Sequence, residues 1–226
     1  MVGKLIVIEG TDCSGKQTQT QLLVEKLNAC GIKSVRLSAP FYDSGTGKII
    51  AGAYLNKTGY GMTSVFPEGA ANVDPKVASL LYAADRLYNA PKIQKFLDEG
   101  INVIMDRYVE SNLAFQGGKI EDKKKRFEMY DFLLKLEYDF LKLPKPDLKI
   151  LLYMPFEASF ILKKNREEKP DEHEKDEKLL KEAENAYLEL VSVCDFKKID
   201  CSKNGIPQSI ECINKKVLKE VLDFLC

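Results

Sequence analysis

The sequence predicts a three-layer α/β fold, in which a parallel sheet of about five strands carries helices on both faces. Short apolar runs alternate with longer amphipathic stretches along the 226 residues, and this alternation is typical of repeated strand–helix units. The apolar runs lack a polar face, as expected for strands that are buried on both sides. Neither an internal repeat nor a linker divides the chain, so we expect one domain that spans residues 1–226.

The expected strands occupy residues 4–9, 33–38, 101–105, 148–153 and 196–200. The first helix fits residues 16–30, where Leu22, Leu23 and Leu27 recur at helical spacing and Gly31 ends the pattern. Further helical patterns cover residues 76–99, 122–141, 156–164, 176–193 and 207–225, with a short helix around 46–56 in a glycine-rich stretch. Residues 163–178 contain no large apolar side chain, which fits either a solvated linker or a mobile lid over a site.

Composition argues against several classes of protein. The 34 basic residues balance 34 acidic ones, whereas a surface that binds duplex nucleic acid shows a clustered basic excess. No apolar run approaches the roughly 18 residues of a membrane span. The six cysteines form no CxxC pair and lie apart from the single histidine, His173, which argues against a zinc centre. We therefore expect a cytoplasmic protein with reduced thiols and with no nucleic-acid or membrane partner.

The segment after the first strand has the form of a phosphate-binding loop. Its glycines allow successive backbone N–H groups to curl around a polyphosphate, and the following helix adds the positive end of its dipole. Lys16 supplies a charge for the terminal phosphates. Gln17 departs from the pattern, because a Ser or Thr that ligates Mg²⁺ normally follows the lysine, and Thr18 lies one position further on. We expect ATP to bind to Gly10, Thr11, Asp12, Cys13, Ser14, Gly15, Lys16, Gln17 and Thr18.

A second polar motif, Asp106-Arg107-Tyr108, directly follows the strand at 101–105. In open parallel sheets ligands bind at the carboxyl ends of the strands, so this motif falls at the same edge as the loop. Asp106 is suited to hold Mg²⁺ through water, and Thr18 is the candidate hydroxyl beside it. Arg107 offers a planar fork to a phosphate. A polar junction without a ligand is the alternative, and the neighbouring loop favours the functional interpretation.

The helix at 76–99 presents one broad apolar face, formed by Val77, Leu80, Leu81, Ala84, Leu87 and Tyr88. Tyr82 and Arg86, four residues apart, share the opposite face. A ring beside a guanidinium suits stacking on a base and hydrogen bonding to its carbonyl. An exposed pair on an amphipathic helix explains the same spacing.

Taken together, the motifs resemble those of the thymidylate kinase family over almost the whole chain. The matching segments are LIVIEGTDCSGKQTQT, LLYAADR, DRYVESNLAFQGG, PDLKILLYMP and DEHEKD followed by AYLEL. Each segment is modestly specific, whereas their joint order is highly specific. The resemblance implies a P-loop nucleoside-monophosphate kinase fold, ATP with Mg²⁺ as the donor complex, dTMP as the acceptor and, as a rule, a homodimer.

The resemblance also assigns roles to individual residues. Asp12 matches the carboxylate that anchors the 3′-hydroxyl of the acceptor sugar, and Arg107 matches the clamp on its phosphate. Tyr82 matches the ring that stacks on thymine, and Arg86 matches the group that hydrogen-bonds the base carbonyl. The resemblance further places Pro40, Phe41, Ser111, Phe115 and Gln116 in the acceptor pocket, and Lys203 in the loop that holds the donor adenine.

Between the second expected strand and the glycine-rich stretch, the sequence departs from the family pattern. The segment Ala39–Asp43 carries Tyr42 at a position where many members carry an arginine. We therefore expect binding of the acceptor phosphate to depend more on Arg107.

A second departure concerns the catalytic cation. The phosphate-binding loop lacks an internal arginine, which is similar to the family branch in which basic residues of the lid, here residues 163–178, complete the site. Arg166 is preferred over Lys163 and Lys164, because five fixed donors suit a moving phosphoryl group. The expected catalytic residues are Lys16, Asp12 and Arg166.

These observations predict transfer of the γ-phosphoryl group of ATP to dTMP, giving dTDP and ADP, through positioning and charge stabilisation rather than covalent chemistry. A kinase for another pyrimidine nucleotide or for a nucleoside stays open, because the expected pocket residues do not by themselves exclude dUMP. A nucleotide-binding protein without transfer activity is a further alternative, prompted by Gln17 and by the irregular segment at 39–43.

Overall fold

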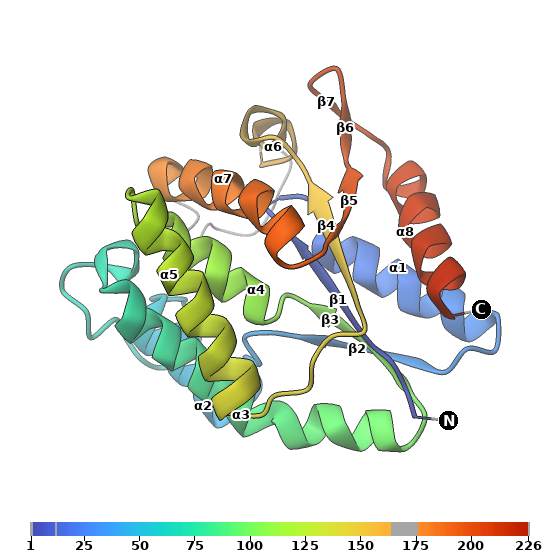
Figure 1. The fold of residues 1–226 in the computed structure, drawn as a ribbon, viewed down its shortest axis with the longest axis horizontal. Coiled ribbons are helices and arrows are strands. Elements are labelled where there is room, and N and C mark those ends of the chain that lie inside the picture. The colour runs from blue at the N-terminus through green and yellow to red at the C-terminus, as the bar shows by residue number, and fades with distance from the viewer. Residues whose placement is uncertain (1, 12, 164–175, 226) are drawn as a thin grey trace.

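The computed structural model describes residues 2–11, 13–163 and 176–225. Within these residues one sheet of five parallel strands forms the centre, in the order β2-β3-β1-β4-β5 (Figure 1). The strands are β1 (Leu5–Gly10), β2 (Ser34–Ser38), β3 (Asn102–Asp106), β4 (Leu148–Tyr153) and β5 (Lys197–Asp200). The expected strands are confirmed, with ends that differ from the expected bounds by one residue at most.

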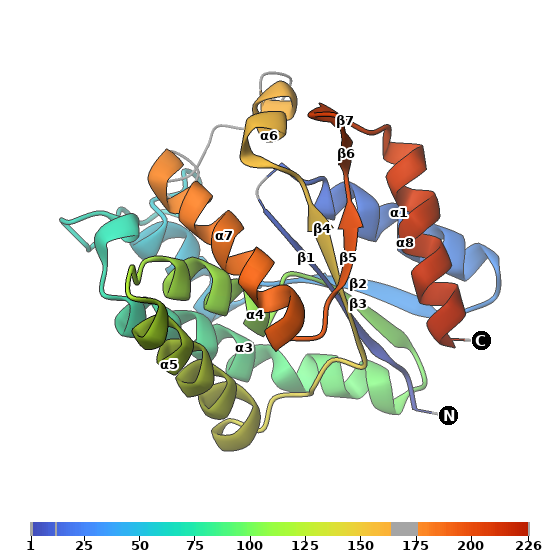
Figure 2. The same ribbon diagram turned by 45° about the horizontal axis from the view of Figure 1, so that its top comes forward.

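Helices cover both faces of the sheet, as the apolar strands require. One face carries α1 (Lys16–Ala29) and α8 (Ile210–Leu225), and the other carries α3 (Pro75–Asp98), α5 (Lys123–Leu134) and α7 (Glu177–Val193) (Figures 1 and 2). Shorter helical segments are α2 (Gly45–Ile49), η1 (Ile50–Tyr54), η2 (Ala70–Asn72), α4 (Val109–Asn112), η3 (Leu113–Gly117), η4 (Lys135–Phe140) and α6 (Phe156–Lys163). The three-layer α/β architecture is confirmed.

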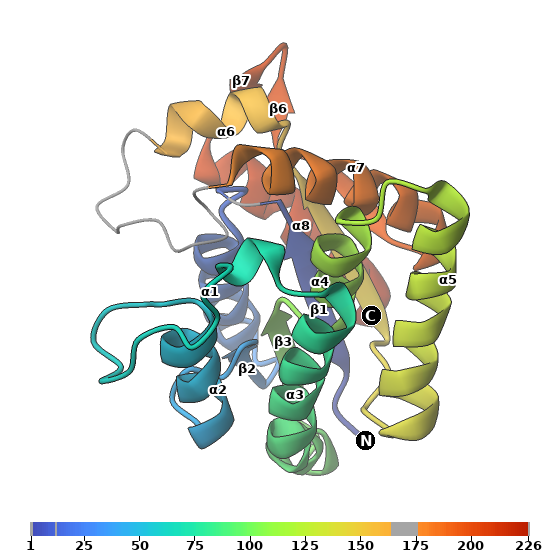
Figure 3. The same cartoon turned by 90° about the vertical axis from the view of Figure 1, so that its left-hand side faces the viewer.

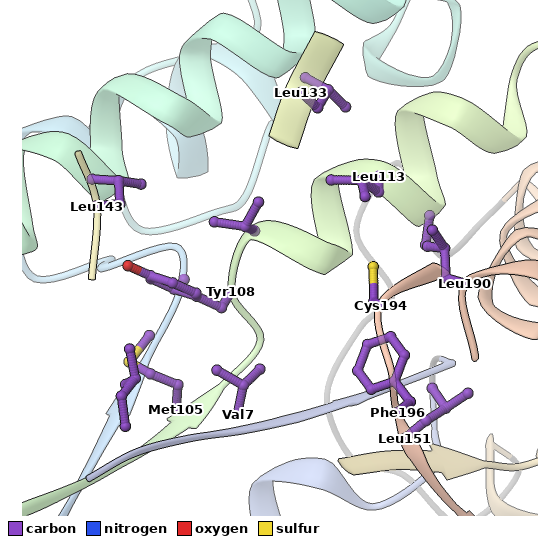
Figure 4. Close-up of a cluster of buried hydrophobic side chains, with 14 of the residues drawn as sticks. Val7, Met105, Tyr108, Leu113, Leu133, Leu143, Leu151, Leu190, Cys194 and Phe196 are labelled. Atoms are coloured by element: carbon purple, nitrogen blue, oxygen red, sulfur yellow. The ribbon is translucent and has the colours of Figure 1, made fainter. Parts of the chain in front are cut away.

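Each face of the sheet has its own apolar core, because alternate residues of a strand point to opposite faces. On one face Val7 packs in a fully buried cluster with Leu113 and Leu190, beneath the helices around α7 (Figure 4). On the other face Ile8 packs with Leu23 of α1. Full burial of such side chains contributes about 1.5–3 kcal/mol each. The two cores therefore hold the strands, and with them the strand ends, in a fixed arrangement.

The carboxyl ends of the strands share one edge of the sheet, because all five strands run in the same direction. The register places Ile8 of β1 beside Asp106 of β3, and Gly10 beside Leu152 of β4. The loop after β1 and the turn after β3 are thus neighbours in space, although about a hundred residues separate them in the chain. This edge is where both predicted polar motifs lie.

The apolar face of α3 is mostly exposed. Five of its six residues are exposed, namely Val77, Leu80, Ala84, Leu87 and Tyr88. The buried side of the helix instead includes Asp85 and Arg86, which are 1% and 3% exposed. Asp85 accepts hydrogen bonds from the backbone N–H of Phe41 (2.9 Å) and the hydroxyl of Thr46 (2.6 Å), and Arg86 pairs with Glu137. Hydrogen-bonded partners from other segments thus compensate for the burial of charge.

Two smaller differences affect segments near the site. The last helix begins three residues later than expected, because a hairpin of β6 (Ser202–Lys203) and β7 (Ile206–Pro207) precedes it. The helical segments α4 and η3, which follow the turn after β3, were not predicted.

Residues 164–175, which make up most of the expected lid, lie outside the described residues. Within the described part of the chain, no helix has the length and apolar character that crossing a membrane requires.

Candidate active site

The loop between β1 and α1 has the conformation of a phosphate-binding loop. Cys13 and Gly15 adopt φ angles of 59° and 83°, in the left-handed region that lets the chain curl. A Cβ at Gly10 would lie 2.5 Å from the carbonyl oxygen of Leu152, so only glycine fits against β4 at this position. The hydroxyl of Thr11 donates a hydrogen bond to a backbone carbonyl just beyond β4 (2.9 Å). The loop is therefore fixed to the edge of the sheet.

Polar groups gather on the inside of this loop. Lys16 is 7% exposed, and its ammonium donates to the carbonyl oxygen of Thr11 across the loop (2.8 Å). The hydroxyl of Ser14 is buried and has no hydrogen-bond partner among the described residues, an arrangement that is costly until a ligand or water satisfies it. Gly15, the N-cap residue of α1, has no side chain to cap the first backbone N–H groups, which point out of the helix end. The loop fits a polyphosphate in its present conformation.

Arg107 approaches the loop from the end of β3. Its φ of 65° is unusual for a residue other than glycine and turns the chain sharply after the strand. The guanidinium donates to the carbonyl oxygen of Gly10 (3.3 Å) and to the hydroxyls of Ser111 (3.1 Å) and Tyr187 (3.3 Å). Arg107 and Lys16 line the same cavity, which has a volume of about 620 Å³. The two predicted anion-binding groups therefore share one space.

A buried carboxylate, Glu9, organises the surroundings of Arg107. Its oxygens accept hydrogen bonds from the backbone N–H groups of Tyr108 (2.7 Å) and Ser111 (3.0 Å). They also accept from the hydroxyls of Ser111 (2.6 Å) and Tyr187 (2.8 Å). Burial, reinforced by the charge of Glu9, raises the pKa of Tyr187 well above its usual value, so its hydroxyl stays protonated and donates. Because Arg107 bonds the same two hydroxyls, Glu9 positions Arg107 through them.

A further group of cavity residues suits a planar base. Arg86 forms a buried bidentate ion pair with Glu137. Burial alone lowers the pKa of Arg86, but Glu137 beside it raises the pKa by more, so the guanidinium keeps its charge. The amide of Gln116 is wholly buried, and neither of its polar atoms has a hydrogen-bond partner among the described residues. Tyr82 contacts Tyr54 edge-on, with 5.7 Å between ring centroids. The pocket thus offers a ring and an unsatisfied amide to a ligand.

Asp106 and Thr18, the predicted metal-binding residues, both line the cavity. One carboxylate oxygen of Asp106 accepts a hydrogen bond from Arg36 (2.6 Å), and Arg36 also donates to the hydroxyl of Thr20 in α1 (2.7 Å). The described residues hold no group of three His, Cys, Asp or Glu side chains arranged for a metal ion. One carboxylate and one hydroxyl fit Mg²⁺, which in nucleotide sites takes most of its ligands from phosphates and water.

Most other predicted residues line the cavity as well, namely Cys13, Ser14, Gly15, Gln17, Pro40, Tyr82, Ser111, Phe115 and Gln116. Phe41 does not, because its side chain packs into the apolar core while its N–H bonds Asp85. Lys203 is exposed on β6, and the cavity wall after the hairpin consists instead of Gln208, Ile210 and Ile213. Asp12, Lys164 and Arg166 lie outside the described residues, as does the side chain of Lys163.

Sequence reasoning missed the charged residues that support the site. Glu9 could have been found from the sequence, because it directly follows an apolar run and precedes Gly10. A carboxylate buried at such a position needs hydrogen-bond donors around it. Arg36 is likewise a charged residue inside an expected strand. Glu137 has no local signal, because it lies 51 residues from its partner Arg86. Only the fold brings those two together.

The sheet order, the glycine loop at the carboxyl edge of β1 and the cavity shared with Arg107 define a P-loop kinase of the nucleotide-phosphorylating class. The family model described as thymidylate kinase matches residues 8–213. The chain belongs to the thymidylate kinase family.

Relatives of known name agree with this assignment. The probable thymidylate kinase 1 of Saccharolobus solfataricus is 31% identical over 95% of this chain and 98% of its own length. The thymidylate kinase of Schizosaccharomyces pombe is 28% identical over 99% of this chain and 97% of its own length. Human thymidylate kinase is 33% identical over 67% of this chain, a match that spans 61% of the human protein. A solved structure of thymidylate kinase from Candida albicans shares the fold, with a TM-score of 0.75 and 24% sequence identity. The match covers 98% of this chain and 92% of the Candida albicans chain.

Proposed function

We propose that the protein transfers the γ-phosphoryl group of ATP to dTMP, producing ADP and dTDP. One observation carries the proposal beyond family membership: the loop around Lys16 and the guanidinium of Arg107 line the same cavity. In-line transfer requires the attacking oxygen and the phosphorus to approach within about 3–3.5 Å. A donor site and an acceptor site in separate cavities would not allow this.

The chain contributes positioning and charge stabilisation. The loop amides and Lys16 hold the donor phosphates, and the fork of Arg107, positioned by Glu9, holds the acceptor phosphate. A phosphate monoester is already largely ionised at neutral pH, so its oxygen attacks without a protein base. Asp106 and Thr18 would hold Mg²⁺, which neutralises charge on the donor phosphates when it is bound.

The base pocket favours a pyrimidine that carries both donors and acceptors. A nucleotide whose base leaves the buried amide of Gln116 without a hydrogen bond binds more weakly. Arg86 keeps a charged guanidinium that can donate to a base carbonyl. Tyr82 supplies the stacking ring. A single methyl group distinguishes dTMP from dUMP, and one such group in an apolar pocket changes kcat/KM by about 10–200-fold. We therefore expect dUMP to be a measurable but poorer substrate.

Two further roles rest on the family resemblance. We assign the contact with the 3′-hydroxyl of the acceptor sugar to Asp12. The cation that balances the moving phosphoryl group is assigned to Arg166, within a lid at residues 163–178. Within the described part of this segment, Asp176 caps the start of α7 by accepting a hydrogen bond from the backbone N–H of Leu179 (3.0 Å).

We also propose that the protein is a cytoplasmic homodimer. The described cysteines are all free thiols, which supports a reducing compartment. The exposed apolar stripe on α3, defined by Val77, Leu80, Ala84, Leu87 and Tyr88, supports a dimer, because monomeric proteins seldom expose such a continuous surface. Light scattering should give twice the 25.5 kDa of one chain. Leu80→Asp combined with Leu87→Asp should yield monomers, and an unchanged mass would exclude this interface.

A coupled assay of ADP release against a panel of monophosphates tests the proposed reaction. The monophosphates are dTMP, dUMP and dCMP, and the nucleoside thymidine is added as a fourth acceptor, each with ATP and Mg²⁺; chromatography identifies the product. The proposal predicts the highest kcat/KM with dTMP and formation of dTDP. A higher kcat/KM with another pyrimidine would assign a different acceptor. Binding of ATP without any product would support a nucleotide-binding protein without transfer activity.

A further inference from the structure

One wall of the cavity lies on the side of the sheet that carries α1 and α8. Gln208, Ile210 and Ile213, from the turn after β7 and the start of α8, line this wall. Figure 3 shows α3 in front of the sheet and α8 behind it. The base pocket of the acceptor comes from α3 and η3. The wall at α8 is therefore the described part of the cavity that is left for the base of a donor nucleotide, whose phosphates the loop at Lys16 holds.

This wall presents an apolar surface. Ile210 is 56% exposed although it lines the cavity, so a planar base would cover an apolar side chain there. The side-chain amide of Gln208 is already occupied. Its NH₂ group donates to the carbonyl oxygen of Asp200 (2.8 Å), and its oxygen accepts from the ammonium of Lys216 (2.9 Å). What the wall contributes to binding therefore depends on where α8 begins relative to the phosphate-binding loop.

Gln19 connects this wall to the loop. It lies in the first turn of α1, where its backbone N–H donates to the carbonyl oxygen of Gly15 (2.9 Å). Its side-chain NH₂ group donates to the carbonyl oxygen of Ile210 (3.0 Å), and its side-chain oxygen accepts from the amide of Asn214 (3.0 Å). A backbone carbonyl can only accept, which fixes the orientation of the Gln19 amide and, through it, that of Asn214. One side chain of α1 thus contacts two successive turns of α8.

These hydrogen bonds add direction to an interface that is otherwise apolar. Both helices contribute to one buried cluster, which includes Leu23 of α1 and Ile213 and Val217 of α8. Apolar contact has no preferred direction, whereas a hydrogen bond depends steeply on distance and angle. Gln19 and Asn214 are 1% and 0% exposed, so water does not compete for their amides. The two amides therefore set the position of the start of α8 relative to the loop.

We propose that Gln19, together with Asn214, is a positioning residue for the donor nucleotide. It places the start of α8 so that Ile210 and Ile213 contact the purine of ATP while the loop at Lys16 holds the triphosphate. The inference deepens the proposed function, because it rests on ATP as the phosphoryl donor. Loss of Gln19 should weaken the contribution of the base to binding and leave that of the phosphates intact.

Calorimetry with ATP and with inorganic tripolyphosphate, each with Mg²⁺, separates the two contributions in the full-length protein. One neutral hydrogen bond is worth up to about tenfold in an equilibrium constant. Gln19→Met loses two of them and should weaken binding of ATP by about 5–20-fold, whereas affinities for tripolyphosphate and dTMP should stay within about twofold of wild type. Gln21→Met, which changes an exposed glutamine of the same helix, serves as the matched control.

A double variant separates positioning from support of the fold. Gln19→Met leaves the amide of Asn214 buried without its acceptor and should lower stability. Combining Gln19→Met with Asn214→Leu removes both polar partners, so the free energy of unfolding should largely recover while the affinity for ATP stays low. Recovery of ATP affinity together with stability would overturn the inference.

Two other results would also overturn it, namely equal losses for ATP and tripolyphosphate in Gln19→Met, or equal affinities of the wild type for both. The ATP titrations use no acceptor, so they decide the inference even if the protein transfers no phosphate. That last outcome would refute the proposed function alone.

Discussion

Replacing Glu9 by glutamine tests whether a buried carboxylate positions Arg107. In wild type the two carboxylate oxygens accept four hydrogen bonds, from the backbone N–H groups of Tyr108 and Ser111 and from the hydroxyls of Ser111 and Tyr187. In Glu9→Gln the remaining oxygen still accepts from the two backbone groups, which cannot rotate. The new NH₂ group faces the two hydroxyls, which must then accept instead of donate. The negative charge near Arg107 is lost at the same time.

The size of the effect follows from the two hydroxyl contacts. A hydrogen bond to a charged group is worth about 1.5–3 kcal/mol and a neutral one about 0.5–1.5 kcal/mol, so each conversion costs about 1 kcal/mol. The total of about 2 kcal/mol corresponds to a ~30-fold lower kcat/KM for dTMP, if it is fully expressed in the transition state. KM for ATP should stay within about twofold, because the donor loop keeps all its contacts.

Steady-state kinetics at saturating ATP, with dTMP varied, measure this effect. Glu189→Gln is the control, because Glu189 also accepts several hydrogen bonds, from Arg126 and Tyr130, but does not line the cavity. The control should lose stability while keeping its kcat/KM for dTMP. A kcat/KM for Glu9→Gln within about threefold of wild type would refute the positioning role, and so would an equal rise in KM for ATP.

Three further predictions concern buried charges and the lid. Glu137→Ala leaves Arg86 buried without its partner and should lower the free energy of unfolding by about 3–5 kcal/mol, measured by urea denaturation; a loss below about 1 kcal/mol would contradict the buried pair. Burial raises the pKa of Glu110 to about 7, with Lys149 opposing the rise, so folding retains a proton that the unfolded chain releases near its usual 4.5. The stability that protonated Glu110 contributes is therefore complete below about pH 4.5, declines between about pH 4.5 and 7, and is lost above 7. Glu110→Gln should remove this decline and stabilise the protein at pH 8 by up to ~3 kcal/mol; equal pH profiles for variant and wild type would contradict the raised pKa of Glu110. Arg166→Ala should lower kcat by about 10³-fold or more while calorimetry shows unchanged ATP binding, and a near-normal kcat would remove Arg166 from the catalytic role.

The features that local sequence determines were predicted well. The five strands follow from apolar runs, and the loop at Gly10–Thr18 follows from glycine spacing between a strand and a helix. The shared edge of the two polar motifs follows from parallel strand direction alone. The structure confirms that edge, because Lys16 and Arg107 line one cavity.

Features that depend on distant partners were predicted poorly. The hydrophobic pattern of α3 does not identify the buried side of the helix, because the helix buries Arg86 against Glu137 and leaves its apolar stripe exposed. Amphipathicity identifies an apolar face but not the surface that covers it, which can belong to another chain. Phe41 was placed in the pocket by sequence position, yet its side chain enters the core.

Calorimetry with a two-headed analogue, in which adenosine and thymidine are joined by a chain of five phosphates, tests the central claim most directly. If the loop around Lys16 and the clamp of Arg107 belong to one continuous site, one analogue binds per chain and competes with both ATP and dTMP. Its affinity should also exceed that of either nucleotide, because one molecule makes both sets of contacts. A complex with the analogue that still binds ATP or dTMP would show that donor and acceptor occupy unconnected sites, and would contradict the proposed transfer.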